Sequence, residues 1–266
     1  MLEKLKVVPI DRIVSFDTPS DERAQKLALE IQHDGKLKNP LLASPLDDKF
    51  LVLDDSSIVL ALESLEVTHV PVQLANPKTI SVYPWQRVID GVIKDDVLLF
   101  CAVFPRQLRV QENPKGTPGR HQAEFKFADD TRLRISLLSR SPLVRADVCA
   151  KLYAGFNSAH KTFRVKLDYA DPHPLHKFPG ASAAVFPPLF SLEDLAAIAR
   201  HEIRLPRGVV RIDQPERLLG IDYALSVLKE NASSEEKEAF LVQLLQLRMS
   251  SDRIAYYNGS VFLFNN

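Results

Sequence analysis

Residues 34–74 read DGKLKNPLLASPLDDKFLVLDDSSIVLALESLEVTHVPVQL, and this stretch decides the fold. It contains two apolar strand candidates, at 41–43 and 50–53, on either side of a polar turn at 47–49, and a third at 69–74. Between the last two, residues 56–65 have apolar side chains at helical spacing. The order strand, turn, strand, helix, strand predicts helices packed on a sheet in an α/β protein.

The flanking segments extend this pattern in both directions. Thr18, followed by Pro19, predicts the start of a helix that ends at Gly35. After residue 74 we expect a helix over 84–94, a buried strand over 97–104, a hairpin from 124–127 to 132–135 and a helix over 143–156. Further on we expect a helix capped at Ser191, a capping box at Ser233 and a closing strand or hairpin over 256–264. A shift in composition near residue 95 predicts two domains, 1–95 and 96–266.

The composition of the chain excludes several classes of protein. Its 266 residues are 45% hydrophobic and 26% charged, with 34 Lys and Arg against 34 Asp and Glu, which is typical of a globular protein. A neutral chain has no overall attraction to nucleic acid, and its apolar runs are too short to span a membrane. The two cysteines, Cys101 and Cys149, lie in apolar segments and are expected to be buried thiols in a reducing cytoplasm.

Several short motifs resemble the ParB/sulfiredoxin fold and, within it, the free L-serine kinases. That family has a Gly-x-x-x-x-Pro turn, a strand and then Leu-Asp-Gly-x-x-Arg opening a helix; here Gly35, Pro40 and the sequence Leu53-Asp54-Asp55 stand in that order. Later segments that resemble the same group lie at 84–86, 205–212, 215–219 and 256–264. The resemblance implies a mixed sheet in a ParB/sulfiredoxin-like N-terminal domain, and a second mixed α/β C-terminal domain that completes the cleft.

The resemblance also implies a reaction: transfer of a phosphoryl group from ATP or ADP, with Mg²⁺, to the hydroxyl of L-serine. Such a transfer needs a carboxylate near the hydroxyl, a metal on the phosphates and cationic donors. The chain departs from the family pattern at these positions: the base is shortened from Glu to Asp17, the turn glycine becomes Asp55 and the arginine clamp becomes Ile58. In the later Thr-Arg-His pattern, only Arg211 is retained.

The predicted site therefore comprises catalytic Asp17 and Asp54, with Asp54 also the metal ligand, a nucleotide site at Asp54, Asp55, Ser56 and Ser57, and an acceptor side at Trp85, Arg211 and Arg217. Each residue type also has a purely structural interpretation. Carboxylates and serines are common where helices begin, and a single tryptophan is often a core residue. The two arginines could instead form internal ion pairs with Asp213 or Glu216.

Three functions follow from these alternatives. The first is an active small-molecule kinase, and the second is a non-catalytic relative that binds an amino acid or a nucleotide, or has a regulatory role. The third is DNA binding, which the zero net charge and the lack of a helix-turn-helix pattern disfavour. The changes at Ile58 and Ile212 favour the second function, in a cytoplasmic protein with no membrane or DNA partner and, unless it is active, no cofactor.

Overall fold

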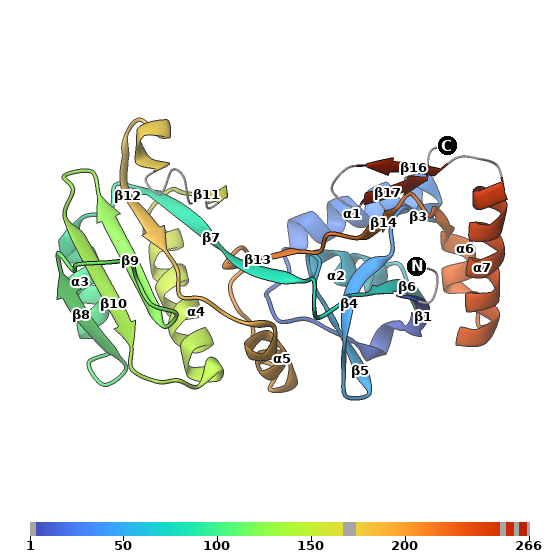
Figure 1. The fold of residues 1–266 in the computed structure, drawn as a ribbon, viewed down its shortest axis with the longest axis horizontal. Helices are drawn as coiled ribbons and strands as arrows, with labels where there is room; N and C mark the ends of the chain where they lie inside the picture. The colour runs from blue at the N-terminus through green and yellow to red at the C-terminus, as the bar shows by residue number, and fades with distance from the viewer. Residues whose placement is uncertain (1–3, 167–173, 251–253, 258–260, 265–266) are drawn as a thin grey trace. The chain divides into compact units, whose positions relative to one another are not determined.

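The computed structural model describes residues 4–166, 174–250, 254–257 and 261–264. The chain forms two compact units, coloured along the sequence in Figure 1. Unit 1 comprises Met1–Ser81 and Ile212–Asn266, and unit 2 comprises Val82–Arg211. This division differs from the expected boundary near residue 95, because the chain leaves unit 1 in strand β7 (Ser81–Asp90) and returns to it in strand β13 (Val210–Asp213).

Unit 1 is built on a five-stranded mixed sheet with the strand order β1-β6-β4-β5-β2. Its strands are β1 (Leu5–Pro9), β2 (Ile13–Val14), β4 (Leu41–Leu46), β5 (Lys49–Val52) and β6 (His69–Leu74), with a 3-10 turn at Ile10–Arg12. β4 pairs antiparallel with β5 and parallel with β6. Smaller sheets join β3 (Lys36–Leu37) to β15 (Tyr223–Ala224), and β14 (Arg217–Leu219) to β17 (Val261–Phe264) and β16 (Ile254–Tyr257).

The helices of unit 1 are α1 (Asp21–Asp34), α2 (Ser57–Ser64), α6 (Leu225–Lys229) and α7 (Ser234–Ser250). The cap of α1 is Ser20 rather than Thr18, because the Ser20 hydroxyl accepts the backbone N–H of Arg23 at 3.4 Å. The core of this unit combines residues from both ends of the chain, with Val52 and Leu62 buried together with Leu218, Tyr223 and Leu241. Residues 212–266 return to this unit because they supply part of its hydrophobic core.

Unit 2 contains an antiparallel sheet in the order β11-β7-β12-β9-β10-β8, with β13 pairing β7 beside this path. Its other strands are β8 (Leu108–Glu112), β9 (Gln122–Phe127), β10 (Arg132–Leu137), β11 (Thr162–Lys166) and β12 (Ala181–Phe186). Its helices are α3 (Lys94–Ala102), α4 (Pro142–Ala159) and α5 (Leu192–Arg200), with a 3-10 turn at Pro174–Lys177. In Figure 1, α4 lies along one face of the sheet, where Phe156 contacts Phe125 with ring centroids 5.4 Å apart.

Two predicted elements of unit 2 are wrong. The helix expected over 84–94 is strand β7, which pairs with β11 and β12; this pairing overrides the helix-start signal of Pro84. The buried strand expected over 97–104 is helix α3, which buries Val97 and Cys101 one turn apart and leaves Leu99 69% exposed. A short apolar run does not distinguish a buried strand from a helix that has only one buried face.

Most of the other predicted elements are confirmed. The hairpin is formed by β9 and β10, and the helix expected over 143–156 is α4. The predicted cap at Ser191 and the predicted capping box at Ser233 both form, and each serine exchanges two hydrogen bonds with the residue three positions later. The closing hairpin is the antiparallel pair β16 and β17, and its turn lies outside the described residues. The expected α/β class with a mixed sheet is therefore confirmed.

The formal charge of the chain is divided unevenly between the two units. Unit 2 contains 20 Lys and Arg against 13 Asp and Glu, which gives +7, whereas unit 1 contains 14 against 21, which gives −7. The neutral total hides this division, so the absence of a DNA partner stays a prediction. Among the described residues, no helix is both long enough and apolar enough to cross a bilayer.

The two cysteines are buried, as expected from the sequence. Burial raises the pKa of Cys101 to about 11 and that of Cys149 to about 12, so almost no reactive thiolate is present near neutral pH. We expect iodoacetamide at pH 8 to label native protein at least about a hundredfold more slowly than denatured protein, as measured by intact mass. Rapid labelling of the native chain would contradict this burial.

Candidate functional site

A cavity of about 400 Å³ lies in unit 1, between helix α1, the segment from β3 to β4, the start of α2 and Arg217. Its apolar lining residues are Leu27, Ile31, Leu37, Pro40, Leu41 and Ile58. Its charged lining residues are Arg23, Glu30, Asp34, Lys36, Lys38, Asp54, Asp55 and Arg217. Three of the residues predicted from the sequence, Asp54, Asp55 and Arg217, are therefore brought together on one cavity wall.

Asp54 is held by groups within unit 1. It follows β5, and its Oδ2 accepts the backbone N–H of Leu42 at 2.6 Å, which extends the pairing of β4 with β5 beyond the last strand residue. Arg217 binds the same carboxylate in a bidentate manner, with both nitrogen–oxygen distances at 3.1 Å. Arg217 thus forms an ion pair, as one interpretation predicted, but its partner is Asp54 rather than Asp213 or Glu216. Glu216 instead pairs with Lys4 at 2.7 Å.

Asp55 lies at the N-terminal end of α2 and makes two charge-assisted contacts. Its Oδ1 accepts the backbone N–H of Ser57 at 3.1 Å, and its Oδ2 lies 2.5 Å from Nε of Arg23 in the first turn of α1. A helix N-terminus and a guanidinium are the groups that proteins use to bind phosphate. Here a carboxylate of the chain itself, with a side chain 26% exposed, is bound by both groups.

The two serines and Asp17 are buried and do not line the cavity. Ser56 stands at the cap position of α2 without a side-chain capping bond, so the expected cap is supplied by Asp55 instead. Its hydroxyl is buried and has no hydrogen-bond partner among the described residues. Ser57 Oγ accepts the backbone N–H of Ser20 at 3.0 Å and so joins the starts of α1 and α2. Asp17 is 8% exposed and does not line the cavity.

Sequence reasoning missed the cations that line this cavity. Residues 36–38, with Lys36 and Lys38, resemble an ordinary solvated cluster, but Lys36 pairs with Asp222 at 2.8 Å and Lys38 pairs with Asp34 at 2.6 Å. The hydrogen bond with Lys38 lowers the pKa of Asp34. Together with the pairs of Arg23 and Arg217, these contacts mean that each of the four cations lining the cavity already faces a carboxylate. The pair of Asp34 and Lys38 could have been found from the sequence, because an acid and a lysine four positions apart commonly form an ion pair.

Unit 2 contains the remaining predicted residues, Trp85 and Arg211, and brings them together. Tyr83 and Trp85 lie two residues apart on β7, and the guanidinium carbon of Arg211 lies 5.0 Å and 5.9 Å from their ring centroids. The backbone N–H of Trp85 donates to the carbonyl oxygen of Val209 at 3.0 Å, which holds the segment before Arg211 against β7. Cation–π contacts of this kind orient a guanidinium without neutralising its charge.

The described residues do not bring three or more His, Cys, Asp or Glu side chains together in a group that could hold a metal ion. Asp54, the predicted metal ligand, already accepts three hydrogen bonds, two from Arg217 and one from Leu42. A magnesium ion would have to compete with a guanidinium for this carboxylate. In its described state, the environment of Asp54 therefore does not fit the metal site that the resemblance implies.

Comparisons with known proteins show which proteins this chain is similar to. No family model matches the chain. One curated relative, the ATP-dependent L-serine kinase SbnI of Staphylococcus aureus, is 28% identical over 88 residues, which span 33% of this chain and 35% of that protein.

Solved structures match over a much larger part of the chain. A C-terminally truncated SbnI from Staphylococcus aureus has a TM-score of 0.76 at 18% identity, covering 93% of this chain and 98% of that one. A free serine kinase in complex with AMP has a TM-score of 0.66 at 14% identity, covering 85% and 93%. A conserved hypothetical protein from Pyrococcus furiosus has a TM-score of 0.62, covering 85% and 97%. The expected resemblance is confirmed: the chain shares the ParB-like fold of the free serine kinases over most of its length.

Proposed function

We propose that this chain is a non-catalytic relative of the free serine kinases that uses its unit 1 cavity to bind a small ligand. The observation that carries the proposal is the position of Asp55, whose carboxylate is bound by Arg23 and by the N-terminus of α2. These groups would otherwise bind a nucleotide phosphate. Because they are already satisfied by Asp55, the cavity favours a ligand that carries little negative charge.

The electrostatics of the cavity support this proposal. Two unit charges ~4 Å apart interact by about 4 kcal/mol at an effective dielectric constant of 20. A phosphate that approached the start of α2 would be repelled by Asp55, and the aliphatic side chain of Ile58 offers it no compensating donor. The four cations lining the cavity are each engaged with carboxylates, so a phosphate would have to share its cation with a carboxylate of the chain.

The alternative is an active kinase with an altered site. It would use Asp17 to orient the acceptor hydroxyl, Asp54 to bind Mg²⁺, and ATP or ADP as the phosphoryl donor. The observation that favours it is the contact of Arg211 with the ring of Trp85, since by the resemblance both residues stand where the serine-kinase pattern has acceptor-site residues. Free serine kinase structures contain AMP or ADP, which is a property of those proteins.

Calorimetry and product analysis on the whole chain distinguish the two functions. We expect ATP, ADP and AMP, each with Mg²⁺ and with or without L-serine, to show no saturable binding below the millimolar range. Phosphorus NMR should then show no phosphoserine. Formation of phosphoserine that is lost in Asp17→Asn and retained in Asp11→Asn, a matched change at an exposed carboxylate, would contradict the proposal and establish the kinase.

A further inference from the structure

Strand β8 forms one edge of the unit 2 sheet, and among the described residues it pairs with β10 alone. A hydrogen bond just after the strand shows which backbone groups face β10: the N–H of Asn113 donates to the carbonyl oxygen of Arg132 at 2.8 Å. Along an antiparallel strand, the backbone groups of successive residues alternate between the two sides. Val110 and Glu112 therefore direct their N–H and C=O groups away from β10, toward the open edge.

Helix α3 lies against this edge strand and exposes apolar side chains (Figure 1). The segment after α3 is joined to β8 where the N–H of Leu108 donates to the carbonyl oxygen of Phe104 at 3.0 Å. Leu99 and Val103, which are four residues apart, are 69% and 70% exposed, and Ile93 at the start of the helix is 58% exposed. An open strand edge beside exposed apolar side chains is typical of a surface that another chain covers.

We propose that a second copy of this chain covers this surface, in a symmetric dimer whose two β8 strands pair antiparallel about Val110. In this register the two Val110 residues exchange a pair of backbone hydrogen bonds. The N–H of Glu112 donates to the outward carbonyl oxygen of Leu108 in the second copy, and the symmetry repeats this bond. Each N–H of β8 that faces away from β10 then has an acceptor, because the N–H of Leu108 is already bonded within its own chain.

The charges of β8 favour a second copy in this register. Arg109 stands opposite Gln111 of the second copy, so no like charges meet across the new strand pair. A register centred on Arg109 or on Glu112 would place two like charges opposite each other. A register centred on Gln111 would bring Pro114, which has no N–H, into the ladder.

The charges around α3 have the same self-complementarity. The symmetry axis of this dimer runs normal to the sheet, so the two α3 helices lie on the same face, one on each side of the new strand pair, and run antiparallel. Asp95, near the start of α3, and Arg106, beyond its end, are both exposed and carry opposite charges. The antiparallel arrangement brings Asp95 of each copy toward Arg106 of the other, and it covers Leu99 in the middle of the helix. A second copy supplies this complementarity by symmetry alone.

Sedimentation velocity and hydrogen exchange on the whole chain test this surface. At about 100 µM we expect mostly a species with twice the 29.9 kDa mass of the chain, which dissociates on dilution because the interface is of modest size. Amide exchange at Val110 and Glu112 should slow at least about tenfold between dilute and concentrated protein, since both amides face outward in the monomer. A chain that stays monomeric at the higher concentration overturns the proposal. So does a dimer in which these two amides exchange as fast as in the monomer.

A pair of matched substitutions shows whether α3 lies in the contact. Leu99→Glu places a carboxylate opposite its own copy and should raise the dissociation constant of the dimer at least about tenfold. Leu247→Glu is the control, because Leu247 on α7 of unit 1 is also 69% exposed, and it should leave that constant unchanged. Both variants should keep the circular dichroism of the wild type, since both positions are exposed. Equal effects of the two substitutions on the dissociation constant would mean that the copies associate through another surface, which overturns the proposal.

Discussion

Replacing Asp55 by glycine and Ile58 by arginine in one chain should raise the affinity for ADP by at least about tenfold. The first change removes a carboxylate from the start of α2 and frees Arg23, and the second adds a guanidinium to the same cavity wall. Because Asp55 is partly exposed, we expect roughly 1.5–3 kcal/mol in binding free energy, less than the full interaction of two charges at contact. Tenfold corresponds to about 1.4 kcal/mol. Isothermal titration calorimetry with Mg²⁺ measures this directly.

The controls separate restored phosphate binding from a general change in charge. Asp48→Gly removes a carboxylate from an exposed turn of unit 1 and should leave ADP affinity unchanged. Adding Arg23→Gln to the double variant should remove much of the gain, because Arg23 is the cation that Asp55 releases. If the double variant binds ADP no better than the wild type, Asp55 is not what prevents nucleotide binding. The proposal that Asp55 excludes phosphate would then fail.

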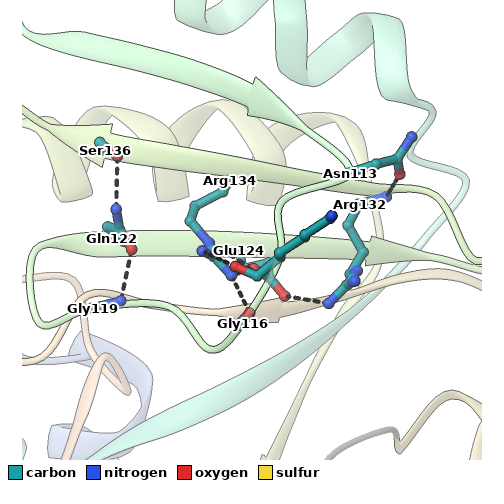
Figure 2. Close-up of polar contacts among 9 residues, drawn as sticks. Asn113, Gly116, Gly119, Gln122, Glu124, Arg132, Arg134 and Ser136 are labelled. Atoms are coloured by element: carbon teal, nitrogen blue, oxygen red, sulfur yellow. Dashed lines mark hydrogen bonds and ion pairs between the residues drawn. The ribbon is translucent and has the colours of Figure 1, made fainter.

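Replacing Arg134 by methionine should destabilise unit 2 by about 3–5 kcal/mol, because it leaves Glu124 buried without its main partner. Figure 2 shows this pair on the face of β9 and β10, where Arg134 Nε and Nη2 lie 2.8 Å and 2.6 Å from Glu124 Oε2. Both side chains are less than a tenth exposed. Arg134 also donates to the carbonyls of Lys115 and Gly116, while Arg132 is 3.9 Å from Glu124. Urea denaturation measures the loss.

A double-mutant cycle tests whether the loss comes from the uncompensated carboxylate. Glu124→Leu combined with Arg134→Met should recover most of the stability, since apolar residues of similar volume often replace a buried ion pair at little cost. Arg109→Met is the matched control, because Arg109 is exposed on β8 and is paired in register with Ser136 of the same sheet. Arg109→Met should change the free energy of unfolding by less than about 0.5 kcal/mol. If Arg134→Met and Arg109→Met lowered the free energy of unfolding equally, the special role of the pair would be contradicted.

Local signals predicted those elements whose formation depends on neighbouring residues. The turn between β4 and β5, the end of α1 at Gly35 and the two capping boxes are each formed by contacts a few positions apart. The predictions for residues 84–94 and 97–104 were wrong because the secondary structure of these segments depends on distant partners. β7 is a strand because β11 and β12 pair with it from positions more than seventy residues later. The secondary-structure propensity of residues 84–94 alone does not predict that pairing.

The sequence by itself determined the α/β class, the resemblance to the free serine kinases and the loss of the glycine and arginine at Asp55 and Ile58. Only the tertiary structure decided which charges neutralise one another. Arg217 binds Asp54 across 163 positions of sequence. Likewise, the neutral total charge divides into −7 and +7 because the chain returns to unit 1 after residue 211. Charges act through distance in space, which local sequence patterns do not record.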